Sequence, residues 1–154
     1  MYRIKGIVPL HIPFIAVVPR SELGLDALMK MVCCDRYYGH NFLDQSEIRD
    51  MVSVREEPYF IYDVESGRDM IGKSPSEAEV LIKEQGRSCL TIDEGIALSL
   101  QTNVLLENGV DCMGSYLERD GLVPNIYLGT KPLLSCRRTD VKNNKRGSPS
   151  CVYR

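Results

Sequence analysis

Cys89 is the residue of this sequence whose surroundings come closest to a catalytic arrangement. It lies two residues after Arg87 and just before the predicted start of a helix at residue 92. A guanidinium and a helix N-terminus both stabilise a thiolate, the reactive form of cysteine. Asp93 and Glu94 occupy the same helix end and oppose a thiolate, and no histidine is near in the sequence to act as a base. A thiol-dependent enzyme is therefore an alternative hypothesis and not the leading one.

The six cysteines limit the redox and metal chemistry open to the chain. They are Cys33, Cys34, Cys89, Cys112, Cys136 and Cys151, without a Cys-x-x-C motif. A chain of 154 residues needs no disulfides to fold, so reduced thiols and a cytoplasmic location are predicted. A redox-sensitive pair formed by Cys136 and Cys151 is an alternative. A zinc site built from scattered cysteines with His11 or His40 is another, but no metal or other cofactor is predicted.

An aromatic and polar loop supplies the first candidate binding site. Tyr37, Tyr38 and His40 lie in a polar, irregular stretch that extends from residue 35 to residue 57. Long loops often carry binding residues because a rigid scaffold presents them at the surface. These side chains are predicted to contact a protein or small-molecule partner, with a histidine that binds only water as the alternative for His40.

A basic C-terminal segment supplies the second candidate site. Residues 137–154 include six basic residues and one acidic residue, which gives a charge of +5 in a chain whose net charge is −2. Arg137 and Arg138 begin this segment, and such asymmetry can mark an arm that binds nucleic acid or another anion. The alternative is a solvated segment that complements the acidic remainder of the chain. Nucleic-acid binding is therefore a second alternative function, and residues 139–150 are predicted to be irregular.

Familiar catalytic motifs are missing from the sequence. It has no glycine-rich phosphate loop, no His-Glu-x-x-His, no Gly-x-Ser-x-Gly and no nucleophile with a paired base at a recognisable spacing. No apolar run reaches the 18 or more residues of a membrane span. The leading hypothesis is therefore a small cytosolic protein that binds a partner macromolecule or a small ligand, without membrane association.

Two helices with clear start signals must position the candidate residues. Thr91 and Glu94 form a capping box, in which the hydroxyl and the carboxylate each accept from the other residue's backbone N–H. Ser74 and Glu77 form a second capping box, and Gly86 supplies a left-handed stop. These signals predict helices over 75–85 and 92–101.

The second of these helices is predicted to be amphipathic. Its apolar residues recur at helical spacing, so one side is expected to be buried while Asp93, Glu94 and Gln101 stay in water. Arg87, which is also a candidate binding residue, would then form an ion-paired collar with Asp93 and Glu94. Gly95 costs about 1 kcal/mol relative to alanine inside a helix, which predicts the close approach of another backbone.

The rest of the chain is predicted to form a sheet and one N-terminal helix capped by Ser21. Strands are predicted over 2–8, 12–18, 58–64, 112–117, 122–128 and 133–138, with a short helix over 46–52. The run 12–18 is apolar on both faces and should lie in the middle of a sheet. The last three strands predict an antiparallel meander. The sequence thus predicts a single α+β domain over residues 1–154, with a mixed or largely antiparallel sheet covered by two consecutive short helices and the N-terminal helix.

Several of these segments together resemble an uncharacterised prokaryotic family, a domain of unknown function. The resemblance rests on Ile12-Pro13-Phe14, Pro58-Tyr59, the block from Gly86 to Gly95, Val123-Pro124 and Gly147-Ser148-Pro149-Ser150-Cys151. The block from Gly86 to Gly95 is the most specific. The family commonly has proline at the position of Cys89 and tryptophan ahead of the Gly-Ser ending, and this chain departs from it at both places. The resemblance implies a fold and no activity.

Overall fold

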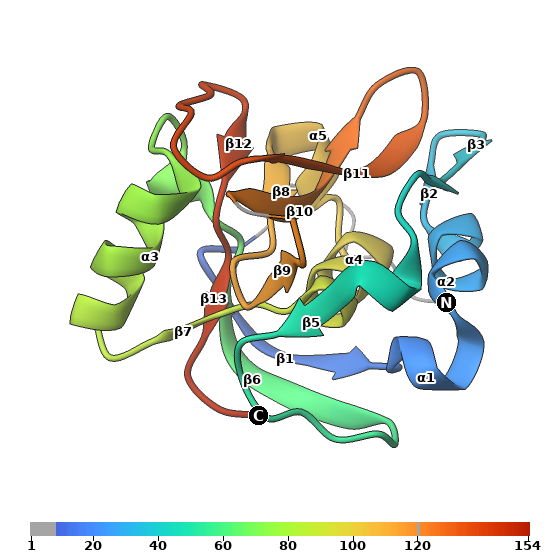
Figure 1. Cartoon of the computed structure of the whole chain (residues 1–154), viewed down its shortest axis with the longest axis horizontal. Helices are drawn as coiled ribbons and strands as arrows, with labels where there is room; N and C mark the ends of the chain where they lie inside the picture. Colours follow the sequence, from blue (N-terminus) through green and yellow to red (C-terminus); the bar gives the residue numbers. More distant parts are fainter. Residues whose placement is uncertain (1–8, 120) are drawn as a thin grey trace.

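The computed structural model describes residues 9–119 and 121–154, and two β-sheets organise it (Figure 1). The first sheet has four strands in the order β1-β6-β13-β7, each antiparallel to its neighbours. Its strands are β1 (His11–Val17), β6 (Tyr59–Glu65), β13 (Ser150–Cys151) and β7 (Ser88–Cys89). The C-terminal segment therefore runs inside this sheet, between β6 and β7.

The second sheet has five strands in the order β12-β8-β10-β11-β4. Strands β8, β10 and β11 are antiparallel, whereas β12 and β4 pair in parallel at the two edges, so the sheet is mixed. Two short pairs, β2–β3 and β5–β9, lie outside it. The bounds are β2 (Cys33–Cys34), β3 (Tyr37–Tyr38), β4 (His40–Asn41), β5 (Ile48–Asp50), β8 (Gly109–Asp111), β9 (Ser115–Leu117), β10 (Leu122–Leu128), β11 (Pro132–Arg138) and β12 (Arg146–Gly147).

The C-terminal meander is confirmed only for β10 and β11, which form a hairpin with Leu122 opposite Arg138. Strand β9 pairs with β5 instead, so that Ile48 lies opposite Leu117. The segment 139–150, predicted to be irregular, contains β12 and the first residue of β13. Pairings between segments far apart in the chain leave no periodic signal in either segment alone, and for this reason the sequence did not reveal them.

Helix α4 (Ile92–Gln101) lies between the two sheets (Figure 1). It contacts β1 of the first sheet and β10 of the second, and nine of its ten residues are buried. The predicted exposure of Asp93 and Glu94 is therefore wrong, since their exposed fractions are 3% and 0%. Amphipathic spacing identifies the side of a helix that must be buried, but other elements decide whether the opposite side is covered as well.

Both capping boxes are confirmed. The backbone N–H of Thr91 donates to Glu94 Oε2 over 2.8 Å, and the backbone N–H of Ser74 donates to Glu77 Oε2 over 2.9 Å. Gly86, with φ of +70°, ends α3 as predicted. The other helices are α1 (Arg20–Leu23), α2 (Leu25–Met31), α3 (Pro75–Glu84), α5 (Val104–Glu107) and the 3-10 turns η1 (Gln45–Glu47) and η2 (Arg68–Met70). None of these described helices is long and apolar enough to cross a membrane.

The N-terminal third departs from the predictions in three places. Among the described residues, β1 lies at the edge of its sheet and not in the middle, and the strand predicted over 2–8 lies outside the described residues. The helix expected after Ser21 begins at Arg20 and is interrupted at Gly24, whose φ of +77° and ψ of 155° are not helical. The helix predicted over 46–52 is a 3-10 turn followed by β5, which is extended because it pairs with β9.

Gly95 contacts a side chain and not the backbone that the sequence predicted. A Cβ at this position would overlap with Sγ of Cys112, which is fully buried directly after β8. The glycine therefore allows α4 to approach the second sheet, and its helix-propensity cost is offset by this packing.

Candidate functional site

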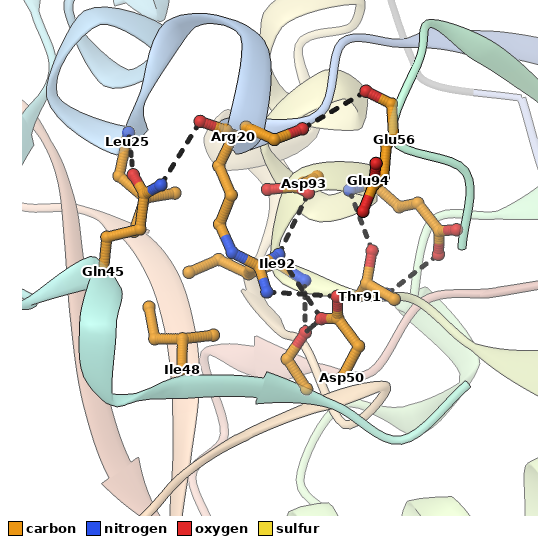
Figure 2. Close-up of polar contacts among 12 residues, drawn as sticks. Arg20, Leu25, Gln45, Ile48, Asp50, Glu56, Thr91, Ile92, Asp93 and Glu94 are labelled. Atoms are coloured by element: carbon orange, nitrogen blue, oxygen red, sulfur yellow. Dashed lines mark hydrogen bonds and ion pairs between the residues drawn. The ribbon is translucent and has the colours of Figure 1, made fainter. Parts of the chain in front are cut away.

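A largely buried ion-pair cluster forms where α1, β5 and α4 meet (Figure 2). Arg20 Nη2 lies 3.0 Å from Asp50 Oδ2, and Arg20 Nη1 lies 3.0 Å from Asp93 Oδ2. Ser115 Oγ donates to Asp50 Oδ1 over 2.6 Å and accepts from the N–H of Ile92 over 2.8 Å. We call Arg20, Asp50, Asp93 and Ser115 the Arg20 cluster. It joins three separate segments of the chain to the first turn of α4.

Hydrogen bonds to neighbouring backbone hold Arg20 in place (Figure 2). Gln45 Oε1 accepts from the N–H of Leu25 over 3.0 Å, and Gln45 Nε2 donates to the carbonyl of Arg20 over 3.3 Å. Gln45 thus bridges the break between α1 and α2. Ser21 Oγ donates to the carbonyl of Glu56 over 3.2 Å and attaches the same turn to the segment before β6. The guanidinium therefore enters the protein from a helix that is fixed at both ends.

Asp93 is the one member of the Arg20 cluster whose polar groups are not all satisfied. Its Oδ1 is buried and has no hydrogen-bond partner, whereas its Oδ2 faces Arg20. Burial raises the pKa of Asp93 to about 6. The Arg20 guanidinium and a hydrogen bond from the Arg20 backbone N–H oppose that rise, and the Asp50 carboxylate adds to it. Because two carboxylates share one guanidinium, the cluster carries one net negative charge when both are ionised.

The neighbouring carboxylate, Glu94, differs from Asp93 in having a partner on each oxygen. Glu94 Oε1 accepts from the Tyr59 hydroxyl over 2.9 Å and from Arg154 Nε over 2.7 Å. Glu94 Oε2 accepts from the N–H of Thr91 over 2.8 Å and from Arg154 Nη2 over 3.0 Å. Burial and the Glu94 carboxylate also raise the pKa of Tyr59, so its hydroxyl stays a donor. A fully satisfied buried pair of this kind is explained by the fold alone.

A mainly apolar cleft of about 320 Å³ lies between β1, α1, α2 and α4. Helix α4 forms one wall of the cleft, and Gln101 lies at the C-terminal end of this wall. The Gln101 side-chain amide is bound to β1, since Nε2 donates to the carbonyl of Ala16 over 2.6 Å. Asp93 lines the opposite end of the same wall, and Leu23 and Met31 are exposed at the rim. The lining consists of Ala16, Val18, Leu23, Leu28, Met31, Asp93, Ile96, Ala97, Leu100 and Gln101. The cleft therefore has an apolar body, with Asp93 at one end of its α4 wall and the engaged amide of Gln101 at the other.

Comparison with known families places residues 4–131 in a family of unknown function, DUF5701. The chain belongs to this family. No curated protein and no solved structure matches it. The Arg20 cluster and the whole cleft lining lie within the DUF5701 match, whereas the C-terminal candidates Arg137, Arg138 and Cys151 lie beyond it. The match confirms the resemblance to an uncharacterised family, and it carries no activity with it.

Arg87, a predicted binding residue, does not form the ion-paired collar with Asp93 and Glu94. Its Nε donates to Ser150 Oγ over 2.8 Å, and its Nη1 lies 3.3 Å from Asp63 Oδ2. The guanidinium therefore ties β6 to β13 inside the first sheet of the DUF5701 protein. The collar prediction failed because residues 88–89 of the linker form β7, which pairs with β13, so that Arg87 lies beside β13 and β6.

The three candidate thiols lie in different surroundings. Burial raises the pKa of Cys89 to about 12 and that of Cys151 to about 11, so neither is a thiolate at neutral pH. Cys136 is partly exposed on β11, in the other sheet from Cys151. None of the six cysteines forms a disulfide, and Cys33 and Cys34 are partly exposed like Cys136.

The remaining candidates from the sequence lie outside the cleft lining. Tyr37 and Tyr38 form β3 and are exposed, and His40 lies in β4 with its ring 4.6 Å from that of Phe42 in an edge-on contact. His11 contacts Asp63 over 2.6 Å. Within the part of the chain that the structure describes, no three His, Cys, Asp or Glu side chains are arranged to hold a metal ion.

The two candidate arginines of the basic segment are both ion-paired. Arg137 Nη1 lies 3.1 Å from Asp111 Oδ2, a carboxylate that is buried, and Arg137 also donates to the carbonyl of Val141. Arg138 lies 2.7 Å from Asp140 at the surface. Part of the positive charge counted in the sequence is therefore neutralised within the fold.

The residues that build the cleft were not identified from the sequence. Arg20 and Asp93 are 73 positions apart, and the sequence placed Asp93 on an exposed helix face. The only usable signal was the position of Asp93 in the specific block from Gly86 to Gly95, which did not indicate a ligand.

Proposed function

We propose that this DUF5701 protein binds a small molecule with a largely apolar body in the cleft between β1, α1, α2 and α4. The observation that carries the proposal is the cleft itself, in which eight of the ten lining residues are apolar. Protein interiors normally leave few spaces larger than a water molecule. Sites for small ligands begin at about 300 Å³ and combine apolar walls with a few placed polar groups, which is the composition found here.

The composition of the lining supports binding. Among the described residues that form it there is no serine, cysteine, histidine or lysine, which leaves the carboxylate of Asp93 as the one side chain that can act as a nucleophile or a base. Asp93 is the titratable group of this lining, and one of its oxygens is engaged by Arg20. The thiol and nucleic-acid hypotheses stay predictions, and the burial of Cys89 and the pairing of Arg137 weigh against them.

We also propose a cytoplasmic location. The support is that a chain of 154 residues needs no disulfides to fold, and that its six cysteines lack the dense spacing of a small secreted protein. Fractionation of cells that produce the protein at natural levels, followed by immunodetection, tests this location.

An NMR titration with hexan-1-ol tests the proposed binding. This probe is neutral and has an apolar chain, and each buried methylene contributes about 0.8 kcal/mol. The amide signals of Ala16, Ile96 and Ala97 should shift and saturate with a dissociation constant on the order of 1 mM, which corresponds to about 4 kcal/mol. Shifts that do not saturate, or that avoid the cleft, would contradict the proposal.

Two variants that fill the cleft serve as negative controls for the hexan-1-ol titration. Ala97→Leu adds bulk from the buried wall of α4, and Ala16→Leu adds bulk from the exposed edge of β1. Either should weaken hexan-1-ol binding by about tenfold or more, since a filled cleft must expel the probe. Val80→Leu adds similar bulk to an exposed position of α3 and should leave binding unchanged.

A further inference from the structure

The basic C-terminal segment still holds positive charge that the fold does not neutralise. Arg137 and Arg138 are paired as described above, and Lys142 Nζ lies 3.2 Å from Glu77 Oε1. The side chains of the next two basic residues, at positions 145 and 146, form no ion pair and no hydrogen bond with any described residue. These two neighbours are therefore the positive charges of the segment that are available to a ligand.

Three adjacent strands of the second sheet hold the Arg146 guanidinium in one place. Arg146 on β12 lies opposite Gly109 on β8. Because Ile126 of β10 pairs with Val110, the next position of β10, Tyr127, lies opposite the same glycine. Arg146 Cζ lies 4.3 Å from the centroid of the Tyr127 ring, so the side chain crosses β8 and stacks on that ring. A Cβ on the glycine would lie 2.5 Å from Arg146 Cδ and 3.0 Å from Nη1, and its absence leaves room for this crossing.

The donors of this guanidinium are accessible. Arg146 is partly exposed, and none of its nitrogens is buried without a partner. Since these nitrogens also donate to no group in the part of the chain that the structure describes, they face solvent. An arginine that is already held by packing loses little side-chain freedom when it binds, and its planar N–H fork matches the spacing of two oxygens of one oxyanion.

The charges around Arg146 also favour an anion. Among the described residues, Asp111 and Arg137 are the charged groups that act on it. Asp111 is buried and its Oδ2 lies 3.1 Å from Arg137 Nη1, so that guanidinium offsets the carboxylate and the charge of Arg146 is left over. Partial burial lowers the pKa of Arg146, because its charged form is less well solvated there than in water. Exposed donors and uncompensated charge are two independent observations that favour the same ligand group.

We propose that Arg146 binds the phosphate group of a small phosphorylated molecule, with its N–H groups donating to two phosphate oxygens. A phosphate monoester carries about −1.5 to −2 charge at neutral pH, which is close to the two unpaired positive charges of Lys145 and Arg146. This site is separate from the cleft, since Arg146, Gly109 and Tyr127 do not line it. Nucleic acid is a poorer fit, because binding it takes several phosphate contacts and the other basic side chains of this segment are already paired.

An NMR titration with glycerol 3-phosphate at pH 8 tests this site, with acetate at the same ionic strength as the comparison anion. The Arg146 Nε–H signal and the amide signals of Gly109 and Tyr127 should shift and saturate with glycerol 3-phosphate. This probe should bind at least about fivefold more tightly than acetate, because it carries more charge and more acceptor oxygens. Equal binding of the two anions, or shifts that avoid these three residues, would overturn the proposal.

Three variants separate a built site from general attraction by a basic surface. Arg146→Gln should weaken glycerol 3-phosphate binding by about tenfold or more. Arg138→Gln removes the same charge from an exposed, paired arginine of the segment and should leave binding nearly unchanged. Gly109→Ala keeps every charge but places a Cβ against Arg146, so it should displace the guanidinium and weaken binding several-fold. Equal losses in the two arginine variants would contradict the site, and this comparison decides the matter if Gly109→Ala does not fold.

A short single-stranded oligonucleotide distinguishes the two sources of phosphate. If it binds more tightly than glycerol 3-phosphate and its binding weakens steeply with added salt, the small-molecule proposal is overturned in favour of nucleic acid. If glycerol 3-phosphate shows no saturable binding at Arg146, the phosphate site is overturned outright. Neither result affects the proposed function, because hexan-1-ol binding is measured at residues of the cleft.

Discussion

Replacing Asp93 by asparagine should stabilise the protein at neutral pH, although the change removes one member of a buried ion pair. Burial raises the pKa of Asp93 from its ordinary value of 3.8 to about 6, so the folded protein holds this proton more tightly than the unfolded chain does. At pH 7 folding therefore includes the cost of burying a charge that Arg20 only partly compensates. Asparagine has nearly the same shape without the charge, and it leaves Arg20 paired with Asp50.

The magnitude and its sign follow from the two pKa values. A rise from 3.8 to about 6, at about 1.4 kcal/mol for each tenfold change in proton affinity, corresponds to about 3 kcal/mol. Below about pH 4 the carboxyl group is protonated in both states, and the two proteins should be equally stable. Between about pH 4 and pH 6 the unfolded chain loses this proton first, so the free energy of unfolding of the wild type falls. Above that range the variant should be more stable by about 3 kcal/mol, or about 6–12 °C in Tm.

Urea unfolding followed by circular dichroism measures this difference across the same pH range. Circular dichroism suits the protein because the chain contains no tryptophan. The free energy of unfolding of the variant must be compared with that of the wild type at each pH, because burial also raises the pKa of Asp111 to about 6. That residue contributes equally to both proteins and cancels from the comparison.

Asp140→Asn is the matched control for the charge change. Asp140 is exposed, and its hydrogen bond with Arg138 lowers its pKa, so it is ionised in both states above about pH 5. Its substitution should leave the shape of the stability profile unchanged there. If Asp93→Asn is less stable than the wild type at pH 8, the attraction of Arg20 outweighs the cost of burial and the reasoning is refuted.

Three further predictions concern the surroundings of α4. Glu94→Gln should destabilise the protein by about 3 kcal/mol in urea unfolding at pH 7, because Arg154 would stay largely buried without a counter-charge; Glu77→Gln, at the exposed capping box, should cost much less. Gly95→Ala should cost about 1–3 kcal/mol through overlap with Cys112 Sγ, despite the better helix propensity of alanine. Most of that cost should be recovered in a Cys112→Ala background, and a purely additive double variant would contradict the steric cause. Iodoacetamide should modify only the three partly exposed cysteines of the folded protein, as read by mass spectrometry, and rapid modification of a buried one would contradict the raised pKa values.

Local signals in the sequence determined α3, α4 and the hairpin of β10 and β11. A capping box links residues three positions apart, as Thr91 and Glu94 show, and Gly86 acts on the turn directly before it. A short loop similarly commits two consecutive strands to pair. The α+β class and membership of an uncharacterised family also follow from the sequence, because both depend on the order of such local elements.

Only the tertiary structure decided what surrounds Asp93. The sequence placed this carboxylate in water, but the two sheets cover α4 from both sides and a guanidinium 73 residues away enters beside it. The insertion of β13 between β6 and β7, and the pairing of β5 with β9, are equally remote from any local signal. A buried charge acquires its partners from segments that meet only when the chain is packed. The unpaired oxygen of Asp93 and the cleft that this residue lines therefore follow from the fold, and not from the residues around Asp93 in the chain.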